Sequence, residues 1–185
     1  MGRNKLLLPL GDRTILARVV DVVLTLLPSK VVVVVRPQTA DTIAKALAGR
    51  PVAIIENADA DRGMGTSIAR AAEFFAGEHQ SLLLLQGDQP FVSATALLDL
   101  GTKFEAEPAA FVASRYGTLV TTPVLFSAAL SSELRMLGGD RGARDVLRRH
   151  WNDGTIVDLP EWMGLDVDDE EAYRRACDLW VATSR

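Results

Sequence analysis

Residues 30–37 read Lys-Val-Val-Val-Val-Val-Arg-Pro. The five consecutive valines lack the alternation of apolar and polar residues that is typical of a strand with one face in water. A continuous β-branched run instead favours a strand that is covered on both faces, as in a parallel sheet. Pro37 ends the run because proline cannot donate a ladder hydrogen bond. We therefore expect a buried strand over residues 30–35.

Helices and strands alternate on both sides of this run. Before it, apolar residues recur at helical spacing after Thr14, which can cap the first turn of a helix. The expected helices cover 14–27, 39–48, 66–76, 93–106, 127–136, 142–150 and 169–182, and the expected strands cover 30–35, 52–56, 81–86, 109–115, 119–126 and 154–158. This alternation is typical of βαβ units. We predict one α/β domain over residues 1–185, with a three-layer, doubly wound, mostly parallel sheet and helices on both faces.

Composition excludes several classes of protein. The 185 residues are 48% hydrophobic and 24% charged, which suits one globular domain. The net charge is -4 and there is no basic run, so a nucleic-acid or anionic-membrane partner has little support. The one cysteine, Cys177, leaves no intrachain disulfide and no CxxC motif. Because no apolar leader is seen in this sequence, we expect a cytoplasmic location.

Two acidic segments are candidate metal ligands. Residues 82–90 read LLLLQGDQP, which places Asp88 directly after a predicted strand, where ligands gather in such sheets. There it can hold Mg2+ together with the phosphates of a nucleotide, although a turn or a helix cap explains it equally well. In LDVDDEE (165–171), Asp166 and Asp168 share one face if the segment is extended. We take Asp166 as the second metal ligand and Asp168 as a helix cap or an additional carboxylate.

Two glycine-containing loops lead into predicted helices. Residues 62–68 read RGMGTSI, where free helix N–H groups and two hydroxyls can receive an anion or a polar ring. Residues 138–144 read GGDRGAR, whose arginines suit phosphate or carboxylate groups. A simple turn before a helix also explains either loop. Neither GxGxxG nor GxxxxGK[ST] is present, so dinucleotide-dependent hydride transfer and P-loop hydrolysis lose support.

The order of these motifs resembles the molybdenum cofactor nucleotidyltransferases, which are MobA-like NTP transferases. The matching segments are MGRNKLLLPL (1–10), GMGTSI (63–68), QGDQP (86–90), GGDRGAR (138–144) and LDVDDEEAYRR (165–175). The resemblance implies a Rossmann-like nucleotide-diphospho-sugar transferase fold. It also implies Mg2+-dependent transfer of a nucleoside monophosphate from an NTP to the phosphate of molybdopterin, with release of pyrophosphate. CTP is favoured over GTP, because two of these motifs look more like those of the cytidylyltransferase branch.

The resemblance also assigns roles to residues. Lys5 matches a lysine that contacts the nucleotide phosphates, Asp88 matches a metal-binding aspartate, and Asp166 falls near the same site. Lys5 and Asp88 are therefore the expected catalytic residues. The remaining nucleotide-binding candidates are Gly63, Thr66, Ser67 and Gly87, and weaker substrate-binding candidates are Asp140, Arg141 and Arg144.

The sequence departs from the family pattern at its start. The family signature begins with a buried strand and a glycine-rich loop, and this sequence starts at the Met-Gly-x-x-Lys end of that signature. We expect the first strand and loop to be missing, and we expect the loss of a central strand to leave backbone groups unpaired and to open the core. A non-catalytic pterin-binding protein or a maturation partner of a molybdenum hydroxylase is therefore one alternative. A guanylyl or sugar-phosphate nucleotidyltransferase of the same fold is another.

Overall fold

The structure, a computed structural model, describes residues 4–78, 80–140 and 142–183. Every predicted helix and strand forms, with bounds that differ by a few residues. The helices are α1 (Ile15–Leu24), α2 (Ala40–Ala46), α3 (Met64–Phe74), α4 (Ala94–Ala106), α5 (Ser131–Arg135), α6 (Gly142–Arg149) and α7 (Glu170–Thr183). The strands are β1 (Pro9–Leu10), β2 (Arg13–Thr14), β3 (Val32–Val35), β4 (Ala53–Glu56), β5 (Leu82–Leu84), β6 (Phe111–Tyr116), β7 (Leu119–Phe126) and β8 (Gly154–Leu159).

Side-chain caps fix the starts of two helices that cover the sheets. The hydroxyl of Thr14 accepts a hydrogen bond from the N–H of Ala17, at 3.2 Å, so α1 begins where the sequence predicted. Ser93 caps α4 in the same way, through the N–H of Ala96 at 3.1 Å. Each cap satisfies a backbone donor that the first helical turn leaves free.

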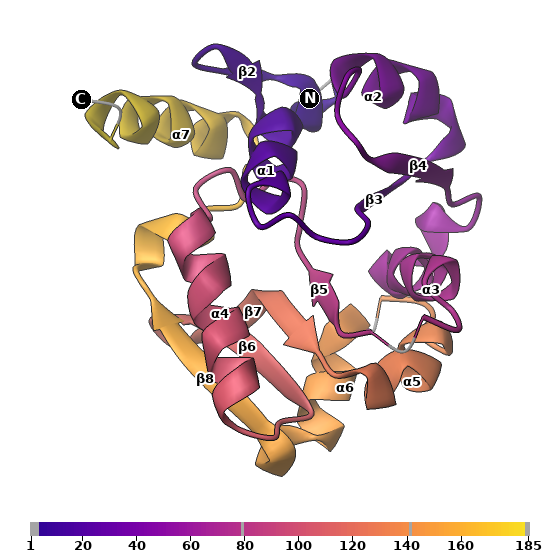
Figure 1. Cartoon of the computed structure of the whole chain (residues 1–185). Helices are drawn as coiled ribbons and strands as arrows, with labels where there is room; N and C mark the ends of the chain where they lie inside the picture. Colours follow the sequence, from indigo (N-terminus) through magenta and orange to yellow (C-terminus); the bar gives the residue numbers. More distant parts are fainter. Residues whose placement is uncertain (1–3, 79, 141, 184–185) are drawn as a thin grey trace.

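Among the described residues, the strands form three separate sheets rather than one. β1 and β2 form a short antiparallel hairpin, β3 pairs with β4 in parallel, and a four-stranded sheet has the order β5-β7-β6-β8. Figure 1 shows β3, β4 and α2 as one group and the four-stranded sheet under α4 as another. Strand directions are more mixed than in the predicted, mostly parallel sheet: β7 is antiparallel to both β5 and β6, and β8 is parallel to β6. The cause is local, because a two-residue turn with Gly117 at φ +60° joins β6 directly to β7.

The β3–β4 sheet and the four-stranded sheet each have their own buried cluster. Phe111, Phe126 and Val146 are fully buried where α5 and α6 pack on the four-stranded sheet. Leu16 and Ile43 are buried where α1 and α2 pack near β3 and β4. Among the described residues, no helix is long and apolar enough to cross a membrane.

A cavity of about 700 Å³ separates the β3–β4 sheet from the four-stranded sheet. Its walls include residues 31–35 of the first sheet and residues 81–85 of the second. We expected both runs to be buried on both faces, but Val32–Val34 and Leu82–Leu84 are only half-buried. The solvent that reaches them therefore enters from this cavity, between the sheets.

Candidate active site

Lys5 binds two carboxylates at one end of the cavity. It lies in a short 3-10 turn (Lys5–Leu7) that begins where the side chain of Asn4 accepts the N–H of Leu6, at 3.1 Å. Its Nζ lies 2.6 Å from Oδ2 of Asp88 and 2.6 Å from Oδ1 of Asp168. Asp88 follows β5 at its carboxyl end, as the sequence predicted. Three distant parts of the chain therefore meet at one ammonium group.

These contacts set the protonation state of Lys5. Burial lowers its pKa, but the hydrogen bonds to Asp168 and Asp88 outweigh burial, so the pKa of Lys5 is raised above its usual value of 10.5. The side chain of Lys5 is 32% exposed and that of Asp88 is 16% exposed. Lys5 is therefore positively charged at neutral pH and partly removed from water, where its charge acts more strongly on a bound anion.

A third carboxylate, Asp166, lies beside this pair. Burial is the main cause that raises its pKa above 3.8, and the negative charges of Asp88 and Asp168 add to the effect. Its Oδ1 is buried, and the side-chain amide of the fully buried Gln89 opposes the rise in pKa by hydrogen bonding to Asp166. Asp166 thus places a partly buried carboxylate next to the Lys5 site.

Asp168 and Asp169 are adjacent in the sequence but have different contacts. We left open whether Asp168 caps the last helix, and it does not: Asp169 accepts the N–H of Ala172 at 2.8 Å and caps α7. Asp168 is the additional carboxylate of the site. The N–H of Val167 bonds the carbonyl of Asp88 at 3.0 Å, which holds the two acidic segments together.

The carboxylates fit a hard cation with few protein ligands. Asp88 and Asp168 each place an oxygen 2.6 Å from the same ammonium group, so both oxygens are within reach of one ion. Asp166 places a further carboxylate nearby. Over the described ranges, no group of three or more His, Cys, Asp or Glu side chains is arranged as a complete metal site. This donor set suits Mg2+, which is usually bound through one or two carboxylates, waters and substrate phosphates.

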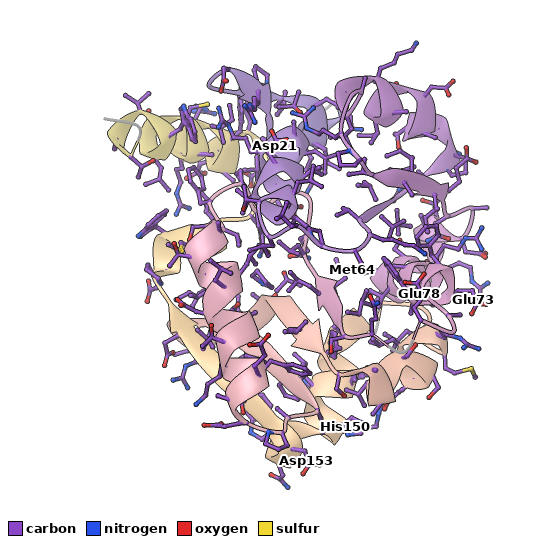
Figure 2. All side chains as sticks on the ribbon, in the orientation of Figure 1. Asp21, Met64, Glu73, Glu78, His150 and Asp153 are labelled. Atoms are coloured by element: carbon purple, nitrogen blue, oxygen red, sulfur yellow. The ribbon has the colours of Figure 1, made fainter. Side chains whose placement is uncertain are left out.

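The first glycine loop is held by a residue that sequence reasoning missed. Asn57 is buried and donates from Nδ2 to the hydroxyls of Thr66 and Ser67, at 2.9 and 3.0 Å. Gln86, directly before the Gly-Asp pair, lies 3.7 Å from the sulfur of Met64 through its amide nitrogen. Figure 2 labels Met64, which lies near β5. The position of Asn57 directly after a predicted strand was the one signal in the sequence.

The second glycine loop packs on the first through its backbone. The N–H of Gly65 donates to the carbonyl of Gly139 at 2.9 Å. A side chain on Gly63 would lie 2.4 Å from Oδ1 of Asp140, so the two loops are in direct contact there. Gly87 lies in the cavity wall, where a Cβ would be 3.0 Å from Leu16. The structure therefore brings Gly63, Thr66, Ser67, Gly87 and Asp140 into one region with Lys5 and Asp88.

Arg144, one of the residues predicted to bind substrate, is not part of this region. Arg144 is exposed on α6 and lines a separate hollow of about 270 Å³ with Arg148 and Trp151. Arg141 lies outside the described residues. His150, which follows α6, bonds Glu133 at 2.7 Å; Figure 2 shows it with Asp153 at the end of the molecule farthest from α7.

A cation, two or three carboxylates and a glycine loop at the carboxyl ends of strands can bind a phosphorylated ligand together with a metal. Comparison with known proteins identifies the family of the chain. The family model of the MobA-like NTP transferase domain matches residues 1–154, so the chain belongs to that family. The related solved structures have the Rossmann-like nucleotide-diphospho-sugar transferase fold, which confirms the predicted fold class and family.

Individual members of known sequence or structure are similar to this chain over most of its length. The chain is 28% identical over 182 residues to a phosphoenolpyruvate guanylyltransferase of Mycolicibacterium gilvum (strain PYR-GCK), covering 94% of this chain and 81% of that protein. It is 26% identical to Rv0371c of Mycobacterium tuberculosis H37Rv, with a TM-score of 0.84 over 96% of this chain and 90% of that one. A complex of Rv0371c with manganese matches with a TM-score of 0.80 and 26% identity, over 96% and 93% of the two chains.

Proposed function

We propose that this protein transfers a nucleoside monophosphate from an NTP to the phosphate group of a small acceptor, with release of pyrophosphate and with Mg2+ as the metal. The observation that carries the proposal is the Lys5 ammonium held between Asp88 and Asp168 at the carboxyl end of β5. Phosphoryl-group transfer depends mainly on positioning and on neutralising charge, and these residues supply both. The manganese complex of Rv0371c supports a divalent metal.

In the proposed reaction, the carboxylates, the lysine and the glycine loop of the site have separate roles. Asp88 and Asp168 would hold the metal, which when bound neutralises charge on the phosphates. Lys5 donates hydrogen bonds to the triphosphate, and the loop with Thr66 and Ser67 binds the base and sugar. An oxygen of the acceptor phosphate attacks the α-phosphorus, the bond from the α-phosphorus to the bridging oxygen breaks, and pyrophosphate leaves in line. Lys5 stays protonated throughout, since its pKa is raised.

Two acceptors are candidates for this reaction. The sequence motifs support transfer of CMP to the phosphate of molybdopterin. The guanylyltransferase of M. gilvum supports a second candidate, transfer of GMP to phosphoenolpyruvate. Both acceptors carry a phosphate monoester, so both fit the same chemistry at Lys5 and Asp88. The two reactions differ in the nucleotide base that is transferred and in the rest of the acceptor molecule.

The test measures pyrophosphate and product together. The purified chain is incubated with α-labelled CTP or GTP, with Mg2+ or Mn2+, and with molybdopterin, phosphoenolpyruvate or buffer alone. We expect one pairing of nucleotide and acceptor to release pyrophosphate and to give a labelled product. Asp88→Asn should remove this activity, whereas Asp99→Asn, at an exposed carboxylate on α4, should retain it. Binding of molybdopterin without pyrophosphate release would instead support the non-catalytic alternative.

A further inference from the structure

The hollow between α6 and β7 is separate from the reaction site. Its volume is about 270 Å³, and its lining residues come from β7, from α6 and from the turn after α6: Val120, Arg144, Leu147, Arg148 and Trp151. None of them lines the cavity that contains Lys5 and Asp88. Figure 2 shows His150, the residue before Trp151, at the end of the molecule farthest from α7. A ligand in this hollow therefore does not compete for the residues of the reaction site.

Two arginines without partners bring positive charge to this hollow. Arg144 and Arg148 are four residues apart on α6, so their side chains lie on the same face of the helix, with Cβ atoms about 6 Å apart. Both residues are exposed, and neither has an ion-pair partner in the part of the chain that the structure describes. The next two residues differ, because Arg149 and His150 both bind Glu133. Like charges at this spacing repel each other, and an anion between them removes the repulsion.

The sheet beside the hollow carries an ion pair that is already neutral. Arg115 of β6 lies opposite Val120 in the strand register, so the two side chains share one face of the sheet. The guanidinium of Arg115 donates two hydrogen bonds to the carboxylate of Asp158, at 2.5 and 2.7 Å. The positive charge at the hollow is therefore that of the two arginines on α6, in a protein whose net charge is -4. This local charge attracts an anion although the whole chain repels one.

The other residues of the hollow are apolar, and one of them is an exposed aromatic ring. Val120 and Leu147 contribute aliphatic side chains. The ring of Trp151 lies 6.5 Å from that of the fully buried Phe111, so the indole is anchored to the core, yet Trp151 is 50% exposed. An indole held in this way offers a rigid surface on which a flat, unsaturated group stacks. The volume is just below the range of about 300–1,000 Å³ that is usual for small-molecule pockets, which favours a small ligand.

We propose that this hollow binds a small flat anion, in which an aromatic or other unsaturated body carries a carboxylate or a phosphate group. The acidic group lies between the guanidinium groups of Arg144 and Arg148, since a guanidinium donates paired N–H bonds to a carboxylate or a phosphate. The flat body lies against Trp151, over the aliphatic side chains. The sequence assigned Arg144 to substrate binding, and the hollow gives it a ligand outside the reaction site. The proposal does not depend on nucleotidyl transfer.

Nuclear magnetic resonance titration of the ¹⁵N-labelled chain tests the proposal at the hollow itself. The chain has three tryptophans, and Trp151→Phe identifies the indole N–H signal of residue 151. The probes are phenyl phosphate, benzoate, inorganic phosphate and benzyl alcohol. We expect phenyl phosphate or benzoate to shift the Trp151 signal with a Kd about tenfold below those of the last two probes, because only the first two combine an anion with a ring. The tighter of the two identifies the acidic group. No shift at millimolar concentrations, or equal affinity for inorganic phosphate, would overturn the proposal.

Variants of the two arginines test the assignment of the acidic group. Arg144→Gln and Arg148→Gln should each raise the Kd of the preferred probe about tenfold, because each removes one charged donor. Arg174→Gln, at an exposed arginine on α7, is the matched control and should leave the Kd unchanged. The signals of the other two tryptophans report that each variant is folded. Unchanged Kd values in both hollow variants would refute the proposal, as would a Trp151 shift that disappears in Lys5→Met, which would place the probe at the reaction site.

Discussion

The contact between the two glycine loops predicts that Gly63→Ala is far more damaging than alanine at a glycine with a similar backbone and open surroundings, such as Gly49. Gly63 has φ +114° and ψ 168°, a region that only glycine populates readily. A Cβ there would lie 2.4 Å from the carbonyl carbon of Gly139 and 2.5 Å from the backbone nitrogen of Asp140. Both neighbours are backbone atoms, so the loop itself has to move.

The expected loss of stability in Gly63→Ala combines backbone strain, overpacking and a change in the entropy of the unfolded chain. Backbone strain at such a position costs about 1–3 kcal/mol, and overpacking adds about 1–3 kcal/mol. The smaller entropy of the unfolded alanine chain offsets about 0.4–1 kcal/mol. Gly63→Ala should therefore lower the free energy of unfolding by about 3 kcal/mol. Gly49→Ala is the matched control, because Gly49 also has a positive φ, +83°, but has nothing within 4 Å of a Cβ. It should lose only about 1 kcal/mol.

Urea unfolding followed by tryptophan fluorescence measures both losses. With a slope of about 2 kcal/mol per molar urea, the midpoints should fall by about 1.5 M and about 0.5 M. Calorimetric titration with CTP and GTP gives a second readout, since displacement of the 63–68 loop should weaken nucleotide binding in Gly63→Ala alone. If Gly63→Ala is no more destabilising than Gly49→Ala, the two loops are not packed as described and the reasoning fails.

Three other perturbations have expected outcomes. Lys5→Met should raise the affinity for Mn2+ without nucleotide about tenfold, because it frees two carboxylates, and should lower transfer; an electron paramagnetic resonance titration showing unchanged affinity would contradict this. Hydrogen bonds from Arg50 lower the pKa of Asp21, so Asp21 stabilises the fold above pH 3.8 and loses this effect as the pH falls through its lowered pKa. Asp21→Asn should therefore cost about 1 kcal/mol in urea unfolding at pH 7 and nothing near pH 2. Ile43→Ala, at a fully buried side chain, should cost about 2–5 kcal/mol in the same assay, against under about 0.5 kcal/mol for the exposed Val181→Ala.

Periodicity predicted the elements because burial repeats along the chain. The valine run and the capped helix after Thr14 are local patterns, and both formed where expected. Strand direction is not a local property: β7 returns antiparallel because of a turn at Gly117 that carries no strong hairpin signal. The β1–β2 hairpin was missed because two-residue strands are too short to show a period.

The position of a site residue could be predicted from the sequence only where a single helix or strand determines that position. Asp88 stands directly after a strand, so its position at the sheet edge follows from the local sequence. Asp166 and Asp168 lie on either side of Val167, whose N–H donates to the carbonyl of Asp88. This backbone contact between distant segments decides which of the two carboxylates reaches Lys5. The sequence favoured Asp166 as the second metal ligand, which stays a prediction, and it did not indicate that Asp168 pairs with Lys5.

Lys5 connects the reaction site to the cavity between β3 and β5, since it binds the carboxylates and also lines the cavity. The carboxylates are held by other parts of the chain: Asp88 follows β5, and the bond from the N–H of Val167 to the carbonyl of Asp88 holds the Asp168 segment. The position of Lys5 depends on the short turn that begins where the side chain of Asn4 accepts the N–H of Leu6. We therefore expect Asn4→Ala to bind Mn2+ about as well as the unchanged protein but to bind a triphosphate more weakly, because only triphosphate binding needs Lys5 in a fixed position. Calorimetric titrations of both proteins measure the two affinities separately, and equal triphosphate affinity would show that this turn does not position Lys5.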